Sequence, residues 1–239
     1  EFRRVLFRSE RLGAVRVRTP DGTPLADVVS VSAGADSACA VTSKGAAWCW
    51  GRNTASQIGD GTTRERRAAV RVKDARGRIK GVETISVGSG FGCLSRRDGS
   101  AWCWGDGFWG NLGDGRSESS KVAVRVIARG GLPRVRQVSA GESHACAATV
   151  SGSAFCWGSN LSGELGTGTH KKSPIAVQVR RGAKALGKVT SVSAGNTFSC
   201  AWQGAPQAVW CWGANESGEV GDGTGDDQYV AVKVLFSFP

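Results

Sequence analysis

The sequence predicts an all-β protein, a partial β-propeller, on three observations. A Trp-Gly pair recurs four times, at Trp50, Trp104, Trp157 and Trp212, with spacings of 54, 53 and 55 residues. Short apolar runs alternate with turns that hold many of the 35 glycines, and no amphipathic helical pattern of any length occurs. A period near 54 residues with about four short strands is typical of a propeller blade, and such blades must stack to bury both faces.

Each repeat begins with a strand that runs into a turn of small residues, VSAGADSAC, ISVGSGFGC, VSAGESHAC or VSAGNTFSC. A hairpin follows, for which CAVTSKGAAWCWG is the first example. Its loop, Ser43-Lys44-Gly45, predicts a type I turn followed by a bulge, with Gly45 in the left-handed region. Gly99 and Gly152 occupy the same position in the next two repeats.

A glycine turn (IGDGT, LGDGR, LGTGT or VGDGT) and a Val-x-Val strand complete each repeat. The resulting repeat cores are about 28–72, 82–126, 135–179 and 189–234, within a repeat region of 10–239. Residues 1–9, EFRRVLFRS, resemble the translation of a sequencing-adapter oligonucleotide and are expected to be an artefact. The 239 residues include no Met, so we expect a fragment of a longer chain.

Eight cysteines fall in pairs, one pair in each predicted hairpin: Cys39 with Cys49, Cys93 with Cys103, Cys146 with Cys156, and Cys200 with Cys211. Counting outward from the loop places each pair on facing, non-hydrogen-bonded positions, about 4.5 Å apart at Cα, which a disulfide can span. The alternative is free thiols that act as small buried apolar groups. Zinc is disfavoured because no C-x-x-C motif is present. Disulfides would indicate an oxidising compartment.

Two tryptophans lie on one face of each hairpin's second strand, except that Phe155 takes the first place in the third repeat. A ring of aromatics that binds sugars or absorbs ultraviolet light is one interpretation. We favour packing between blades, because aromatic residues at the strand period usually belong to a core. Trp109 and Trp202 break the repeat and are the better candidates for exposed contacts.

The segment VSAGADSACAVTSKGAAWCWGRNTASQIGDGT resembles repeats of the regulator of chromosome condensation family, particularly its Cys-containing bacterial members. The resemblance recurs four times and covers residues 10–239. It implies a β-propeller, most often of seven blades, of which this chain would supply about four. The functions that it implies range from exchange factors for a small nuclear GTPase and ultraviolet photoreceptors to a secreted β-lactamase inhibitor and bacterial surface proteins, so fold does not decide function.

The photoreceptors of the family carry their chromophore Trp after the turn glycine, where this sequence has Ala35, Ser89, Glu142 and Asn196. The exchange factors extend a wedge from one blade, whereas the repeats here vary only from 53 to 55 residues. Both interpretations are therefore disfavoured, although a further blade could hold either feature.

The formal net charge is +11, and basic residues concentrate in segments 64–80 and 171–188. These segments could meet on one rim of the stacked repeats as a nucleic-acid-binding patch. A solvated basic surface is the simpler explanation, because no aromatic residue is interleaved to stack on bases.

Catalytic and metal-binding signals are weak. His144 and His170 lie at non-equivalent positions without a nucleophile motif, and the repeated Asp60, Asp114 and Asp222 fit turn chemistry better than a calcium loop. No phosphate-binding glycine loop precedes a helix, and no apolar run reaches the roughly 18 residues of a membrane span. We expect no cofactor, no metal and no enzymatic activity.

The sequence thus predicts an exported bacterial propeller that is extracellular, on the cell surface or periplasmic. It would bind a protein or another macromolecule through its variable loops, at residues that the sequence does not identify. The alternative is a guanine-nucleotide exchange factor for a small GTPase.

Overall fold

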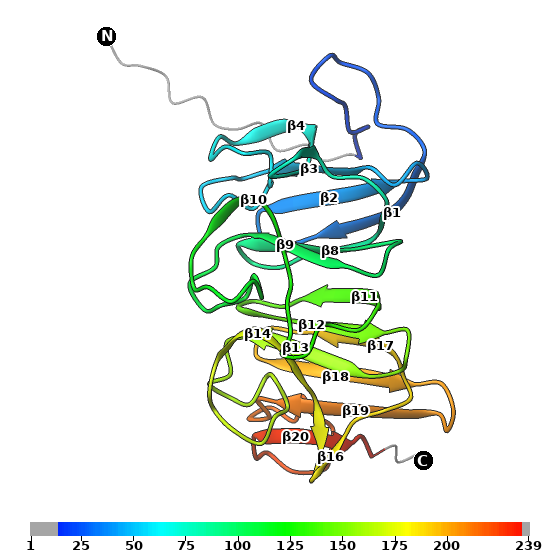
Figure 1. Ribbon diagram of the computed structural model, residues 1–239, viewed down its shortest axis with the longest axis vertical. Helices are drawn as coiled ribbons and strands as arrows, with labels where there is room; N and C mark the ends of the chain where they lie inside the picture. The colour runs from blue at the N-terminus through cyan, green and yellow to red at the C-terminus, as the bar shows by residue number, and fades with distance from the viewer. Residues whose placement is uncertain (1–13, 236–239) are drawn as a thin grey trace.

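The computed structural model describes residues 14–235, and in this range the chain forms twenty β-strands and no helix. The predicted all-β class is confirmed. Four sheets of four consecutive antiparallel strands follow one another along the longest axis, from the first near the N-terminus to the last near the C-terminus (Figure 1). The predicted adapter segment, residues 1–9, lies outside the described residues.

Each sheet is built on four strands that are consecutive in the sequence. The first contains β1 (Val28–Ala33), β2 (Ser37–Thr42), β3 (Ala47–Gly51) and β4 (Arg66–Arg71). The second contains β7 (Val82–Val87), β8 (Phe91–Arg96), β9 (Ala101–Gly105) and β10 (Ser120–Arg125). The third contains β11 (Val135–Ala140), β12 (His144–Thr149), β13 (Ala154–Gly158) and β14 (Ser173–Gln178). The fourth contains β17 (Val189–Ala194), β18 (Phe198–Gln203), β19 (Ala208–Gly213) and β20 (Gln228–Lys233).

Two short hairpins lie in the connections between sheets. They are β5 (Lys73–Asp74) with β6 (Gly77–Arg78), and β15 (Arg180–Arg181) with β16 (Lys184–Ala185). The first hairpin also joins the neighbouring sheet, because β5 pairs in parallel with β10. A connection that leaves one sheet therefore helps to hold the next.

The hairpin between β2 and β3 has the predicted three-residue loop. The Thr42 N–H donates to the Ala46 carbonyl over 3.0 Å, and the Gly45 N–H donates back to the Thr42 carbonyl over 2.8 Å. Gly45 has a φ of 72°, which a residue without a side chain adopts at little cost. This loop sets the register in which Cys39 faces Cys49.

All eight cysteines are joined as disulfides in the pairs that the spacing indicates, and the two Cα atoms of each pair are 4.0–4.1 Å apart. Each bridge links the two central strands of its own sheet. In the first three sheets both sulfur-bearing residues are fully buried: Cys39, Cys49, Cys93, Cys103, Cys146 and Cys156.

Successive sheets pack with the disulfide face of one against the tryptophan face of the next. Trp104, Trp157 and Trp212 are fully buried in these interfaces, as the packing interpretation predicts. Each indole N–H also reaches back to a carbonyl of the preceding repeat: Trp104 to Gln57 over 2.9 Å, Trp157 to Asn111 over 2.9 Å, and Trp212 to Glu164 over 2.7 Å.

Glycines make this close approach sterically feasible. A Cβ atom at Gly59 would lie 2.6 Å from the Trp104 ring, and Gly113 and Gly166 meet Trp157 and Trp212 in the same way. At the inner ends of the sheets, a Cβ at Gly88 would lie 2.2 Å from the Gly141 carbonyl oxygen. In each of the first three repeats, one glycine of the small-residue turn and one of the later glycine turn are therefore positions where the next repeat touches the backbone.

The first sheet has no preceding sheet within the described residues. Its β1 residue Val31 is 71% exposed, whereas the corresponding Ile85 of the second sheet is buried. Trp50, which corresponds to Trp104, is only partly buried. The same residue type thus occupies two environments in one chain.

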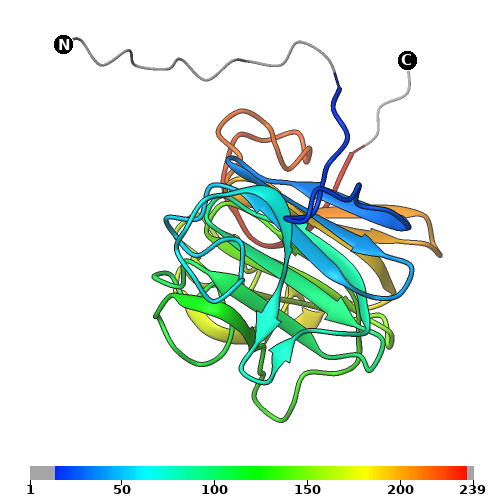
Figure 2. The ribbon, with the colours of Figure 1, turned by 90° about the horizontal axis from the view of Figure 1, so that it is seen from above.

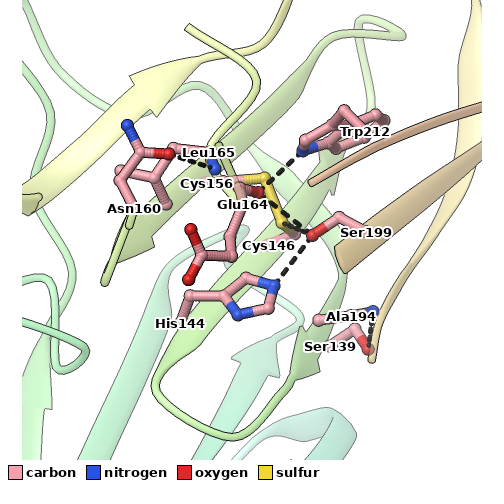
Figure 3. Close-up of a disulfide and its surroundings, with 10 residues drawn as sticks. All are labelled: Ser139, His144, Cys146, Cys156, Asn160, Glu164, Leu165, Ala194, Ser199 and Trp212. Carbon is pink, nitrogen blue, oxygen red and sulfur yellow. Dashed lines mark hydrogen bonds between the residues drawn. A yellow bond between two sulfur atoms is a disulfide. The ribbon is translucent and has the colours of Figure 1, made fainter. Parts of the chain in front are cut away.

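His144 is fully buried between the third and fourth sheets, at the position that Phe91 and Phe198 hold in their repeats. Its Nε2 lies 2.8 Å from Ser199 Oγ, and that hydroxyl donates a hydrogen bond to the Glu164 carbonyl over 3.1 Å (Figure 3). Nε2 must therefore carry the imidazole proton, which leaves Nδ1 as a buried acceptor without a partner. Burial lowers the pKa of His144 from its ordinary 6.5 to about 4.

We predict that Trp157→Ala destabilises the protein by about 3–5 kcal/mol, because it removes a buried indole and leaves the Asn111 carbonyl unpaired. Trp50→Ala is the matched control and should cost much less, since Trp50 is only partly buried. Denaturant unfolding of both variants tests this, and equal losses would contradict the proposed role of the inter-sheet contact.

We predict that His144 makes stability fall as the pH drops from about 6.5 to about 4. The unfolded chain binds a proton at His144 below about 6.5, whereas the folded chain resists protonation until about 4, so up to about 3 kcal/mol is lost in this window. His144→Phe should remove most of this dependence and raise stability at neutral pH. Unfolding curves across the window measure it, and an unchanged pH profile in the variant would disprove the assignment.

Candidate interaction surface

The antiparallel order of the strands sorts the connecting segments onto two opposite faces. We call one the loop face: it carries the β1–β2 turns and the long β3–β4 loops with their counterparts, and the Arg52 N–H donates there to the Asp36 carbonyl over 2.9 Å. The connection face carries the hairpin turns and the segments between sheets, and there the Ser43 N–H donates to the Asp27 carbonyl over 2.8 Å. Figure 2 looks down the stack, with segments protruding from the sheets on more than one side.

The two faces differ in charge. The inter-sheet segments of the connection face, 72–81, 126–134 and 179–188, hold ten Lys or Arg residues and one Asp. The long segments of the loop face, 52–65, 106–119, 159–172 and 214–227, hold five Lys or Arg residues and eleven Asp or Glu residues. The connecting parts of the two basic sequence segments, 72–81 and 179–188, therefore share one face.

An asparagine side chain braces three of the four long loops, and sequence reasoning missed it. The Asn160 amide donates to the carbonyls of Thr169 (2.6 Å) and Lys171 (3.1 Å), and its oxygen accepts from the Leu165 N–H over 2.9 Å (Figure 3). Asn53 and Asn215 make the same bonds in their repeats. The sequence contains a signal for it, because each Asn follows the Trp of its Trp-Gly pair by three residues.

The repeated aspartates serve the turns. Asp60 accepts from the Thr62 N–H and hydroxyl, over 3.0 and 2.8 Å, and pairs with Arg66. Although burial would raise the pKa of Asp60, these hydrogen bonds and the Arg66 charge lower it below its ordinary value. Asp222 makes the same bonds to Thr224. Within residues 14–235, no three His, Cys, Asp or Glu side chains meet in a group that could hold a metal ion.

Exposed aromatic and aliphatic side chains gather on the loop face. Phe108 and Leu161 occupy equivalent loop positions and are 63% and 65% exposed. Phe108 packs edge-on against Trp109, with ring centroids 5.3 Å apart. The Lys172 ammonium, from the next repeat, lies 5.7 Å from both rings.

The same surface continues into the fourth repeat. His170 Nδ1 lies 3.0 Å from the Leu161 carbonyl oxygen, and the His170 ring lies 4.3 Å from the ring of Tyr229. We call this set the loop-tip patch: Phe108, Trp109, Leu161, His170, Lys172 and Tyr229. It joins side chains of three repeats into one partly apolar surface.

The other candidate residues from the sequence lie at different places in the structure. Trp109 lies in the loop-tip patch, whereas Trp202, 37% exposed, lies in strand β18. The four positions compared with photoreceptor tryptophans line one open hollow of about 300 Å³ beside the stacked glycine turns: Ala35, Ser89, Glu142 and Asn196. No helix within the described residues is long and apolar enough to cross a membrane.

Known proteins show similar sequences. The chain is 32% identical over 203 residues to the E3 ubiquitin-protein ligase HERC2 of Homo sapiens, covering 83% of this chain and 4% of that protein. It is 30% identical over 205 residues to the ultraviolet-B receptor UVR8 of Arabidopsis thaliana, covering 84% and 44%. The chain therefore spans less than half the length of these relatives.

Solved structures show the same fold. Human WBSCR16 superposes with a TM-score of 0.77 at 21% identity, over 89% of this chain and 55% of that one. Yeast RCC1 (Prp20), solved with Kap60, gives 0.73 at 20% identity, over 88% and 49%.

Repeats described as "Regulator of chromosome condensation (RCC1) repeat" match residues 98–148 and 151–202, and a second description of the same repeat matches 28–57 and 135–164. Together these matches span more than half of the chain and fall on the stacked sheets. With its Trp-Gly hairpins and its partial propeller, the chain belongs to the family of RCC1-repeat proteins.

Proposed function

We propose that this chain is a non-catalytic, protein-binding segment of an exported bacterial RCC1-repeat protein, and that the loop-tip patch is its contact surface. The observation that carries the proposal is the exposure of Phe108 and Leu161 at equivalent positions of neighbouring loops. Aromatic side chains in an exposed cluster are enriched in protein interfaces, where they dominate the binding energy.

The loops that carry the patch are rigid, which favours recognition. Asn160 fixes the backbone of the third loop, and Gly110 of the second loop sits so close to Pro174 that a Cβ there would lie 2.8 Å from its Cα. A surface that is ordered before binding loses less conformational entropy on association. The exposed side chains therefore form a preorganised contact surface.

The test uses a photo-crosslinking amino acid at position 108 of the full chain. We expect crosslinks to a protein partner from the extracellular fraction of the producing organism, and none from the same probe at Val150, an exposed residue outside the patch. With that partner purified, Phe108→Ala should weaken binding by about tenfold or more, whereas Val150→Ala should not. Equal crosslinking at both positions, or unchanged binding by Phe108→Ala, would reject the patch.

Export is supported by the four disulfides, since such bonds persist in oxidising compartments and are rare in the cytosol. We predict that, in protein purified from its natural source without reductant and then denatured, the eight cysteines of this chain are alkylated only after reduction, as peptide mass spectrometry measures. Alkylation of all eight before reduction would place the protein in a reducing compartment.

The second candidate is a guanine-nucleotide exchange factor. It is favoured by the structural similarity to Prp20p of Saccharomyces cerevisiae, which has been described with binding properties to Gsp1p and histones. The measurement is release of a fluorescent guanine nucleotide from purified Gsp1p. Acceleration that is lost on Phe108→Ala would favour this candidate over a non-catalytic role.

A further inference from the structure

A hollow of about 470 Å³ lies where the β5–β6 hairpin crosses the side of the second sheet. We call it the Trp102 hollow. Six side chains carry its chemistry: Asp74, Arg76, Arg96, Asp98, Trp102 and Arg125. It lies apart from the loop-tip patch, since none of its lining residues belongs to that set.

The indole ring of Trp102 lines the hollow, and packing and a hydrogen bond hold the ring in one orientation. The ring is partly buried and packs on the core between the first and second sheets. Its indole N–H donates to Ser100 Oγ over 2.9 Å, and that hydroxyl donates to Asp98 over 2.6 Å. A ring held in this way can contact the apolar face of a ligand without losing further conformational freedom.

Two of the three arginines form no salt bridge with the residues that the structure describes. Arg96 forms a salt bridge to Asp98 at 3.2 Å and donates from Nε to the Lys80 carbonyl over 2.8 Å. The guanidinium groups of Arg76 and Arg125 are exposed and form no hydrogen bond or salt bridge with residues 14–235. They are therefore available to bind an anion in the bidentate manner that guanidinium favours.

The two carboxylates limit the charge that the hollow can accept. Burial would raise the pKa of Asp98, but hydrogen bonds from Ser100 and the charges of Arg96 and Arg125 lower it below its ordinary value, so it is ionised at neutral pH. Asp74 accepts the Arg76 N–H over 2.8 Å. Three guanidinium groups against two carboxylates leave one net positive charge.

We propose that the Trp102 hollow binds a uronate unit of an acidic polysaccharide. A uronate matches each feature: one carboxylate for Arg76 and Arg125, hydroxyl donors for Asp74 and Asp98, and an apolar ring face for Trp102. A polyphosphate fits less well, because its several negative charges would lie against the two carboxylates.

The Arg96 guanidinium lies 6.0 Å from the Trp102 ring centroid, and tryptophans at the same strand position in two other repeats also have an arginine over the ring. Arg71 lies 5.3 Å from the ring centroid of Trp48, and Arg181 lies 4.9 Å from that of Trp210. The third repeat has Phe155 at this position. A linear polymer could therefore contact more than one repeat, and binding should strengthen with its length.

The experiment is calorimetric titration of the full chain with tetragalacturonate at pH 7 and low salt. The matched ligand is the methyl-esterified tetramer, which keeps the ring and loses the charge. We expect the acid to bind at least about tenfold more tightly than the ester. Arg76→Ala and Arg125→Ala should each weaken binding of the acid by about tenfold or more, as expected for a charged hydrogen bond.

Arg129→Ala is the control variant, because Arg129 is an exposed arginine of the next inter-sheet segment that does not line the hollow. It should bind as the unmodified chain does. The proposal is overturned if the acid does not bind, if the ester binds as tightly, or if Arg129→Ala loses as much affinity. It is also overturned if ATP or an oligothymidylate binds more tightly than the acid, which would indicate a phosphate or nucleic-acid site.

Discussion

The architecture depends on one contact, in which the indole ring of one repeat packs directly on a glycine of the repeat before it. The N–H of Trp157 reaches the Asn111 carbonyl while its ring covers Gly113, and the same arrangement recurs at the other two interfaces. A buried indole contributes a large apolar area, but its N–H must also be satisfied. The contact buries the indole ring and also gives its N–H a carbonyl acceptor. Because the ring lies directly on the glycine backbone, a residue with a Cβ atom does not fit at that glycine position.

This stacking determines where recognition can occur. The faces of the inner sheets are covered by their neighbours, so the loops, the connections and the sides of the sheets remain free to bind. Loops in compact domains usually lie on the surface and carry function, and here asparagine braces such as Asn160 keep them ordered. The opposite charge balance of the loop face and the connection face then gives the chain two chemically distinct surfaces, one with the loop-tip patch and one with an excess of arginine and lysine.

The interface between the third and fourth sheets accommodates a polar residue, His144, where two other repeats have phenylalanine. Ser199 and His144 form a polar contact beside the Cys146–Cys156 disulfide (Figure 3). The buried Nδ1 of His144 has no partner, a cost that a phenylalanine at this position avoids. The local disulfide and the neighbouring indole of Trp212 keep the interface closed around this imperfect contact, so one unfavourable group does not disrupt the stack.

The sequence by itself determined the repeat, the four hairpins, the facing cysteines and the packing role of the tryptophans, because these follow from periodicity and from local turn geometry. It also indicated Trp109 and Trp202 as candidates for exposed contacts; Trp202 is 37% exposed, whereas Trp109 is partly buried within the loop-tip patch. The tertiary structure alone decided that Phe108, Lys172 and Tyr229 share one surface, and that Arg76 and Arg125 flank Trp102. The three patch residues come from three repeats, and Arg76 comes from the connection that precedes the sheet of Trp102 and Arg125. These pairings have no fixed sequence spacing, so the packing of the sheets brings them together.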